Sequence, residues 1–181
     1  MKFSEMPYKR IDMEEVEKEY KSIIERTKNA KSGEEQFEIH REYYKFTADV
    51  QTSMELAMIR HDIDTTDEFY EKESDFYDEV GPIISQYENE YGKVLYDSPY
   101  RDYLESKIGK VTFKNIEIAN KAFDEKIIPL MQEENALSSR YSKLIATAKI
   151  PFEGVVYNLS LMRKFQTSPD RELRRKAWKA V

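Results

Sequence analysis

Residues 32–57 read SGEEQFEIHREYYKFTADVQTSMELA, and this stretch decides the fold. Ser32 and Glu35 form a capping box, in which the two side chains satisfy free backbone amides at the start of a helix. Apolar side chains then recur on one side, at Phe37, Tyr43, Phe46, Val50, Met54 and Ala57. This spacing fits 3.6 residues per turn, so the stretch predicts a long helix with one apolar face.

Further helix-start signals divide the rest of the first 148 residues. Each is a capping residue, a proline at the first helical position or both, and they stand at Asp12, Thr65, Ser98–Pro99 and Thr112. Gly81–Pro82 is expected to break or kink a helix, because proline disfavours helical backbone at the preceding residue. A last long apolar stripe runs from about Met131 to Ala148. These patterns predict an all-α fold, mainly a bundle of long antiparallel helices.

The pattern changes at residues 149–158, which read KIPFEGVVYN. β-Branched and aromatic residues flank Glu153–Gly154, so the segment predicts one short β-hairpin. Pro151 confines its strand to an edge, because proline cannot donate to a sheet. We therefore expect a helical region of residues 1–148 and a second region of residues 149–181, which holds the hairpin and the start of a final helix.

Residues 167–181 read TSPDRELRRKAWKAV and begin that final helix. Ser168 is expected to cap it, and Asp170 places a negative charge at the positive end of the helix dipole. Leu173 and Ala177 then recur at helical spacing. No Gly, Asn or Pro follows, so the helix has start signals and no stop signals. We therefore expect this sequence to be the front part of a longer chain.

Composition narrows the class of protein. Charged residues make up 35% of the sequence and hydrophobic residues 40%, a balance typical of a helical protein with solvated faces. The net charge of -6 argues against a nucleic-acid partner, and we interpret the basic side chains of residues 171–179 as a solvated face. There are no cysteines, which excludes thiolate chemistry and Cys-ligated zinc. No secretory signal or membrane span is recognisable, which favours a cytoplasmic protein.

The residues form no recognisable catalytic constellation. Neither His40 nor His61 has a second histidine four residues away, as a zinc-protease helix requires. Neither follows a glutamate by three residues, as a di-iron bundle requires. His61 with Asp62 and Asp64 could offer metal ligands, but we interpret this cluster as helix capping and solvation. The chain alone is therefore predicted to bind no metal and to be inactive.

Four motifs, in order, carry a resemblance to a known family. They are MPYKRID at 6–12, IRHDIDTTDEFY at 59–70, the segment from EEN at 133–135 to IPFEG at 150–154, and SPDR at 168–171 with Arg174 and Ala177. Over essentially the whole chain they resemble the N-terminal part of the oligoendopeptidase F branch of the thimet-oligopeptidase-like zinc metallopeptidases.

The resemblance implies a longer, mostly helical parent enzyme that binds one zinc and hydrolyses short peptides inside a deep channel. In this family a His-Glu-x-x-His helix and a later glutamate bind the metal, and this sequence contains none of those positions. No catalytic or metal residue is therefore carried over. The chain would form a wall and lid of the channel, and its partners would be the oligopeptide substrate and an absent C-terminal catalytic domain. An apolar strip facing that domain should promote self-association near the hairpin and final helix.

Asp170, Arg171, Arg174 and Ala177 match a family motif to which we assign a structural role. Arg171 and Arg174 are three residues apart and share a helix face, so one of them could pair with an acidic residue of a neighbouring helix. The alternative role for these two arginines is contact with a substrate carboxylate. The alternative function is a self-standing helical protein–protein interaction module without catalysis, which the long amphipathic helices would also suit.

Overall fold

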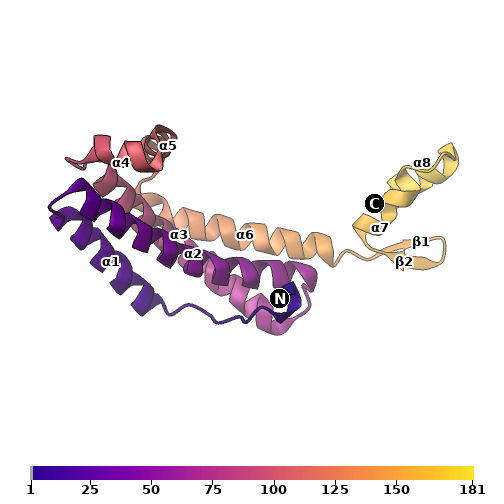
Figure 1. Ribbon diagram of the computed structural model, residues 1–181. Coiled ribbons are helices and arrows are strands. Elements are labelled where there is room, and N and C mark those ends of the chain that lie inside the picture. Colours follow the sequence, from indigo (N-terminus) through magenta and orange to yellow (C-terminus); the bar gives the residue numbers. More distant parts are fainter. Residues whose placement is uncertain (1) are drawn as a thin grey trace. The chain divides into compact units, whose positions relative to one another are not determined.

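The computed structural model describes residues 2–181, and in that range it contains eight α-helices and one β-hairpin (Figure 1). The predicted all-α fold with a small hairpin is confirmed. The chain forms two compact units, Met1–Glu133 and Glu134–Val181. The division falls inside a helix, whereas the sequence pattern placed a boundary at residues 148 and 149. Among the described helices, none combines the length and hydropathy needed to cross a membrane.

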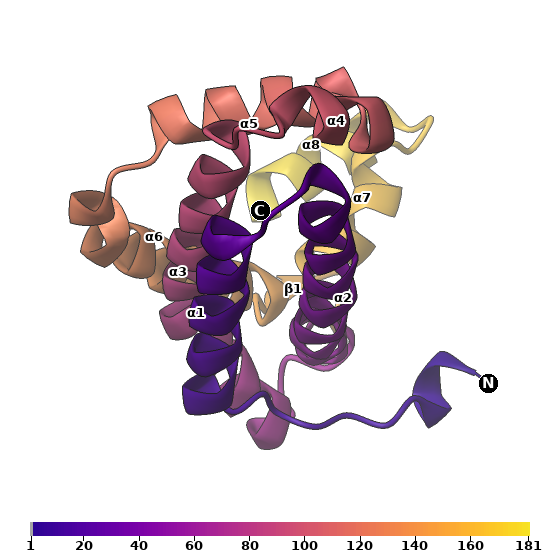
Figure 2. The same cartoon turned by 60° about the vertical axis from the view of Figure 1, so that its left-hand side comes forward.

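The first unit is built on three long helices that run side by side (Figures 1 and 2). They are α1 (Met13–Asn29), α2 (Gly33–Ile63) and α3 (Glu68–Tyr96), preceded by a 3-10 helix, η1 (Phe3–Glu5). Short connections make consecutive helices antiparallel, and each of the three packs against the other two. Helices α4 (Arg101–Ile108) and α5 (Lys110–Ala122) lie across one end of them (Figure 2). A second 3-10 helix, η2 (Glu125–Ile127), follows α5.

Buried apolar side chains form two clusters in this unit, and only some of them belong to the predicted stripes. One joins α1, α2, α3, α4 and α5, and contains Ile23, Ile24, Ile39, Tyr91, Leu95, Leu104 and Phe113. The other joins the three long helices, and contains Val16, Tyr20, Val50, Ala57, Tyr77, Val80 and Ile84. Each such side chain stabilises the fold by about 1.5–3 kcal/mol when fully buried, so these two clusters hold the bundle together.

Acidic and hydroxyl side chains cap the long helices. The Asp12 carboxylate accepts hydrogen bonds from the first amides of α1, and the Ser32 hydroxyl accepts one from the amide of Glu35, 3.1 Å away. Both caps agree with the sequence prediction. At α3 the predicted cap, Thr65, is wrong, because Asp67 fills that position. The Asp64 carboxylate binds the amide and hydroxyl of Thr66, and the resulting turn moves the helix start two residues downstream.

The sequence predicted a break or a kink at Gly81–Pro82, and the break does not occur, because α3 continues through these residues. A proline inside a helix removes one backbone hydrogen bond and costs roughly 3 kcal/mol. Val80, Pro82 and Ile84 are all buried in this stretch. Burial of three adjacent apolar side chains offsets the cost of the proline, a contribution that sequence periodicity alone does not weigh.

Two of the shorter helices also begin away from the predicted residue. The cap of α4 is Tyr100 and not Ser98, although the Ser98 hydroxyl accepts a hydrogen bond from the amide of Tyr100 at 3.0 Å. Thr112 lies inside α5, where its hydroxyl donates to the carbonyl of Ile108. Gly109 separates the two helices at a φ of 90°, a conformation that favours glycine, and this sharp turn fixes where α5 begins.

The second unit holds most of α6 (Ile128–Ala146), the strands β1 (Ile150–Phe152) and β2 (Val155–Tyr157), and the helices α7 (Leu159–Gln166) and α8 (Arg171–Ala180). The strands pair antiparallel, with Ile150 opposite Tyr157. Glu153 and Gly154 form the turn with φ angles of 49° and 80°, the left-handed conformation that tight hairpins require. The predicted hairpin at residues 149–158 is therefore confirmed.

Candidate functional site

The predicted site residues Asp170, Arg171, Arg174 and Ala177 lie at the start of α8. The Asp170 carboxylate caps the helix, accepting hydrogen bonds from the amides of Glu172 at 2.9 Å and Leu173 at 3.3 Å. The predicted cap, Ser168, is therefore wrong. Its hydroxyl accepts a hydrogen bond from the amide of Asp170 and shapes the turn before the helix. A carboxylate is the better cap here, because its charge also complements the helix dipole.

Arg174 reaches back over the start of its own helix. One nitrogen of its guanidinium, Nη1, donates to the carbonyls of Ser168 at 2.5 Å and Pro169 at 2.9 Å. Within the second unit, these contacts are with backbone and not with the acidic side chain that the sequence suggested. Asp170 and Arg174 thus fix opposite sides of one turn, the first through amides and the second through carbonyls.

Ala177 and Arg171 face different surroundings. Ala177 is fully buried in the core of the second unit, where Ile150, Phe152 and Met162 surround it. A small side chain at this position lets α8 lie close to β1. Arg171 is exposed, and no residue of the described chain pairs with its guanidinium. Of the four motif residues, Arg171 is thus the one whose side chain is available to another molecule.

Exposed apolar side chains follow one face of α6 in the second unit. Leu137, Tyr141, Leu144 and Ile145 are 54%, 66%, 67% and 37% exposed, and their spacing places them on the same side of the helix. A cavity of about 430 Å³ lies between this face and the start of α7, where Asn158 and Leu159 contribute to its wall. An exposed apolar face of this kind marks a contact surface. We refer to these four residues as the α6 face.

The first family-like motif binds a buried carboxylate of α3 in the first unit. Glu73 of α3 is 4% exposed, and its side chain accepts hydrogen bonds from Tyr8 and from two nitrogens of Arg10, with Arg10 Nε at 2.8 Å. Hydrogen bonds from Arg10 lower the pKa of Glu73 and outweigh the effect of burial. We refer to these three residues as the N-terminal clasp.

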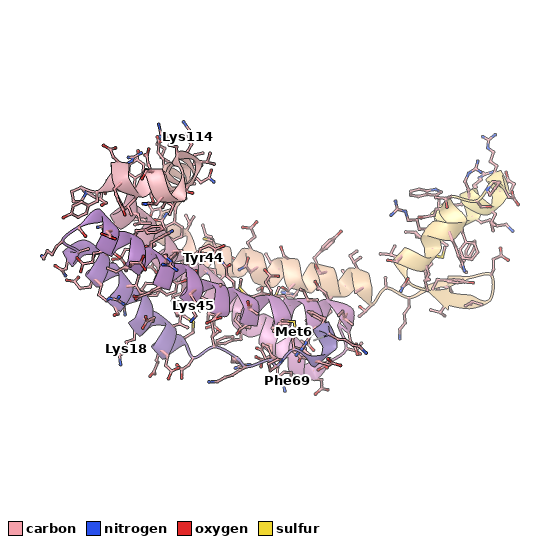
Figure 3. All side chains as sticks on the ribbon, in the orientation of Figure 1. Met6, Lys18, Tyr44, Lys45, Phe69 and Lys114 are labelled. Atoms are coloured by element: carbon pink, nitrogen blue, oxygen red, sulfur yellow. The ribbon has the colours of Figure 1, made fainter. Side chains whose placement is uncertain are left out.

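Arg60 of the second motif joins the first two motifs directly. Its guanidinium donates to the carbonyl of Met6 at 2.6 Å and to the hydroxyl of Tyr70 at 2.7 Å. Met6 and Phe69 accordingly lie at the same end of the first unit (Figure 3). Sequence reasoning missed Arg60 and Glu73 as partners of the N-terminal segment. The sequence shows that each of these residues is charged. It does not show which distant residues they contact, because periodicity carries no information about pairing.

The described residues offer no metal centre. No group of three or more His, Cys, Asp and Glu side chains between residues 2 and 181 is arranged to hold an ion. His61 is 8% exposed, and its Nδ1 lies 3.9 Å from the neighbouring carboxylate of Asp62.

Comparison with known proteins identifies the family of this chain and similar solved structures. The sequence model of the Peptidase M3 N-terminal domain matches residues 3–123. Among proteins with curated descriptions, none matches the chain. Among solved structures, PZ peptidase A with inhibitor 2 is 40% identical with a TM-score of 0.95, over 99% of this chain and 32% of that one.

Two further solved chains are similar to this chain over nearly its whole length. A chain assigned as an oligoendopeptidase F is 39% identical with a TM-score of 0.96, over 99% of this chain and 32% of that one. A chain assigned as an oligoendopeptidase F from Bacillus anthracis str. Ames is 37% identical with a TM-score of 0.95, over 99% of this chain and 33% of that one. This chain therefore spans about a third of the length of the solved chains it matches. With two thirds of its residues matched by the family's sequence model, it belongs to the Peptidase M3 N-terminal domain family.

Proposed function

We propose that this chain is the non-catalytic N-terminal part of a zinc metalloendopeptidase that hydrolyses short peptides. One observation carries the proposal. Nearly the whole chain matches about a third of each of three peptidase chains, at 37–40% identity and TM-scores of 0.95 or above. This likeness favours a peptidase component over the self-standing interaction module.

The proposal divides the work between this chain and the rest of the parent. Residues 1–148 would form the wall and lid of the substrate channel, and residues 149–181 would lead into the catalytic domain. The described residues lack a cluster of metal ligands, so we assign the zinc and its ligands to the part of the parent that this chain does not cover. The residues of this chain would then limit which peptides enter and would take no part in bond cleavage.

The α6 face supports a contact with the rest of the parent. Four apolar side chains on one helix face are more than a third exposed each, and burial of such surface is the main source of stability at domain contacts. Arg171 is the residue that we propose for a contact with a substrate carboxylate, because its guanidinium has no partner among the described residues. Arg174 already binds two carbonyls, and we assign it a structural role.

An activity assay tests the proposal directly. Residues 1–181 and the full-length parent are incubated separately with a quenched fluorogenic peptide, with and without a chelator, followed by added zinc. We expect cleavage by the parent, loss of activity with chelator and recovery with zinc, and no cleavage by residues 1–181. Chelator-sensitive cleavage by residues 1–181 would contradict the assignment of the metal ligands. A parent that cleaves no peptide would remove the enzyme assignment.

A further inference from the structure

A hydrogen-bonded pair of rings joins α2 and α3 in the core of the first unit. Tyr91 of α3 is 2% exposed, and its hydroxyl lies 3.0 Å from Nδ1 of His40 of α2. The two rings are parallel to within 4°, with centroids 6.1 Å apart. The channel function proposed above uses neither side chain, so this pair is considered on its own chemistry.

His40 can act as a base toward the Tyr91 hydroxyl. Burial lowers the pKa of His40, so its ring is neutral at neutral pH. A neutral imidazole has one accepting and one donating nitrogen, and we assign the acceptor to Nδ1 because the buried hydroxyl then has a group to donate to. A phenol that has lost one electron is a strong acid, so even an imidazole weakened by burial takes its proton. Tyr91 can therefore lose an electron and a proton together.

Tyr43 of α2 gives the electron a way out of the core. Its ring stacks on that of Tyr91 with centroids 3.7 Å apart and an angle of 19° between the planes. At this separation the two π systems are in contact. Tyr43 is half-buried, whereas Tyr91 is excluded from water. An electron can thus pass from Tyr91 through Tyr43 toward the surface while the proton moves to His40.

Two other tyrosines of the first unit lack this combination. Tyr77 is 3% exposed, but within residues 2–181 its hydroxyl has no hydrogen-bond partner and therefore no base. Tyr8 donates to Glu73, a carboxylate that already binds Arg10, and its ring meets neighbouring rings edge-on. Tyr91 differs from both, because it has a neutral base, a stacked phenol and no exposure to water.

We propose that Tyr91 and His40 form a site of reversible one-electron oxidation, with a small radical oxidant as co-reactant. The oxidant gains one electron from the Tyr91 phenol, and the O–H bond breaks as the proton moves to His40 Nδ1. The products are the reduced oxidant, a neutral phenoxyl radical and an imidazolium. An ene-diol reductant then returns one electron, and the proton returns to the phenol oxygen. The pair thus takes up an oxidising equivalent without a covalent change in the chain.

The first arm of the test oxidises residues 1–181 with photogenerated tris(bipyridine)ruthenium(III) and follows the radical by EPR. We expect a tyrosyl signal with a slow phase that decays at least about tenfold more slowly than the radical of N-acetyltyrosinamide, because water and other radicals are kept away. Tyr91→Phe should remove the slow phase. Tyr77→Phe is the matched control and should keep it. Absence of a slow phase, its persistence in Tyr91→Phe or its loss in both variants would overturn the proposal.

Reversibility has its own measurement. Ascorbate, an ene-diol, should erase the signal, and the mass of the recovered chain should equal that of the untreated chain. An oxygen adduct or a cross-link at Tyr91 would contradict a reversible site.

The second arm tests His40 as the base. His40→Gln keeps a polar side chain and removes the base, so it should lower the yield of the slow phase at least about tenfold. His61→Gln is the matched control, because His61 is also buried and its Nδ1 lies near Asp62. It should leave the yield unchanged, and an unchanged yield in His40→Gln would refute the pair.

Isotope labelling of the unaltered chain decides the question if a variant does not fold. With histidine labelled by ¹⁵N, the slow tyrosyl signal should show a coupling to ¹⁵N, because the proton that left Tyr91 stays hydrogen-bonded between the two rings. A slow signal without that coupling would overturn the proposal.

Discussion

Glu73 accepts hydrogen bonds from two residues that lie 63 and 65 positions earlier in the chain, Arg10 and Tyr8. The carboxylate is buried, whereas the side chain of Arg10 is 45% exposed. The N-terminal clasp therefore joins a segment before α1 to the first third of α3. A buried acid of this kind is costly without its partner, so loss of Arg10 should destabilise the contact between the N-terminal segment and α3.

Arg10→Ala should destabilise the first unit by about 2 kcal/mol. The value lies below the ~3–5 kcal/mol seen for fully buried pairs, because solvent already screens half of the Arg10 side chain. Urea denaturation at pH 7 measures the change. Arg41→Ala is the control, since Arg41 and Glu38 are both exposed, and it should cost less than about 0.5 kcal/mol. Equal effects of the two substitutions would show that the clasp contributes no more than a surface ion pair.

The clasp also predicts the direction of a pH dependence. Arg10 lowers the pKa of Glu73 in the folded chain below its ordinary value near 4.5. The stabilisation is therefore complete above that value and is lost as the pH falls through the folded pKa. The difference in unfolding free energy between the natural chain and Arg10→Ala should shrink on acidification below pH 4.5. A difference that stays constant down to pH 3 would contradict this linkage.

His40 gives the stability of the fold a second pH dependence, which is independent of the N-terminal clasp. Its ring stacks against Tyr43 and Tyr91, its Nδ1 lies 3.0 Å from the Tyr91 hydroxyl, and burial lowers its pKa. The unfolded chain thus takes up this proton at a higher pH than the folded chain, so stability should fall as the pH drops below about 6.5. Titration of the ring signals by NMR should give a midpoint below 6.5, and a midpoint above that value would refute the assigned cause.

At the scale of elements, the sequence predicted which helices exist better than where they begin. The predicted stripe of α2 is buried or half-buried throughout, because helical periodicity indicates which face is covered. In α3 the stripe is covered less completely, since Phe69 is 54% exposed. The starts of α3, α4, α5 and α8 differ by a few residues. Each shift has a local cause, as at α3, where the turn around Asp64 brings Asp67 to the cap. Several residues near each start could cap, and the choice depends on the turn that precedes the helix.

A pair of substitutions separates the two candidate caps of α8. Asp170→Ala removes a side chain that binds two amides and should destabilise the second unit by about 1 kcal/mol. Ser168→Ala removes one hydrogen bond outside the helix and should cost less. Hydrogen exchange at the amides of Glu172 and Leu173 measures both effects locally. A larger effect of Ser168→Ala would restore the serine as the cap.

At the scale of the whole molecule, sequence patterns predicted the helices and the β-hairpin but not which apolar surfaces stay exposed. Leu137, Tyr141 and Leu144 look like core positions in the sequence, because they follow the same periodicity as the buried stripes of the first unit. In the structure each of them is more than half exposed. Periodicity gives the apolar face of a helix, and it does not reveal whether anything within the same chain covers that face.

The α6 face predicts how residues 1–181 behave in solution. Exposed apolar surface favours association, whereas the loss of translational freedom opposes it, so we expect weak, concentration-dependent self-association. Light scattering over a concentration series should show a rising mean mass, and the double substitution Tyr141→Gln with Leu144→Gln should abolish the rise. Val111→Gln is the matched control, because Val111 of α5 is 74% exposed and lies outside the α6 face. A monomer at every concentration would contradict the prediction. An equal loss in the control would show that exposed apolar area in general, and not the α6 face, causes the association.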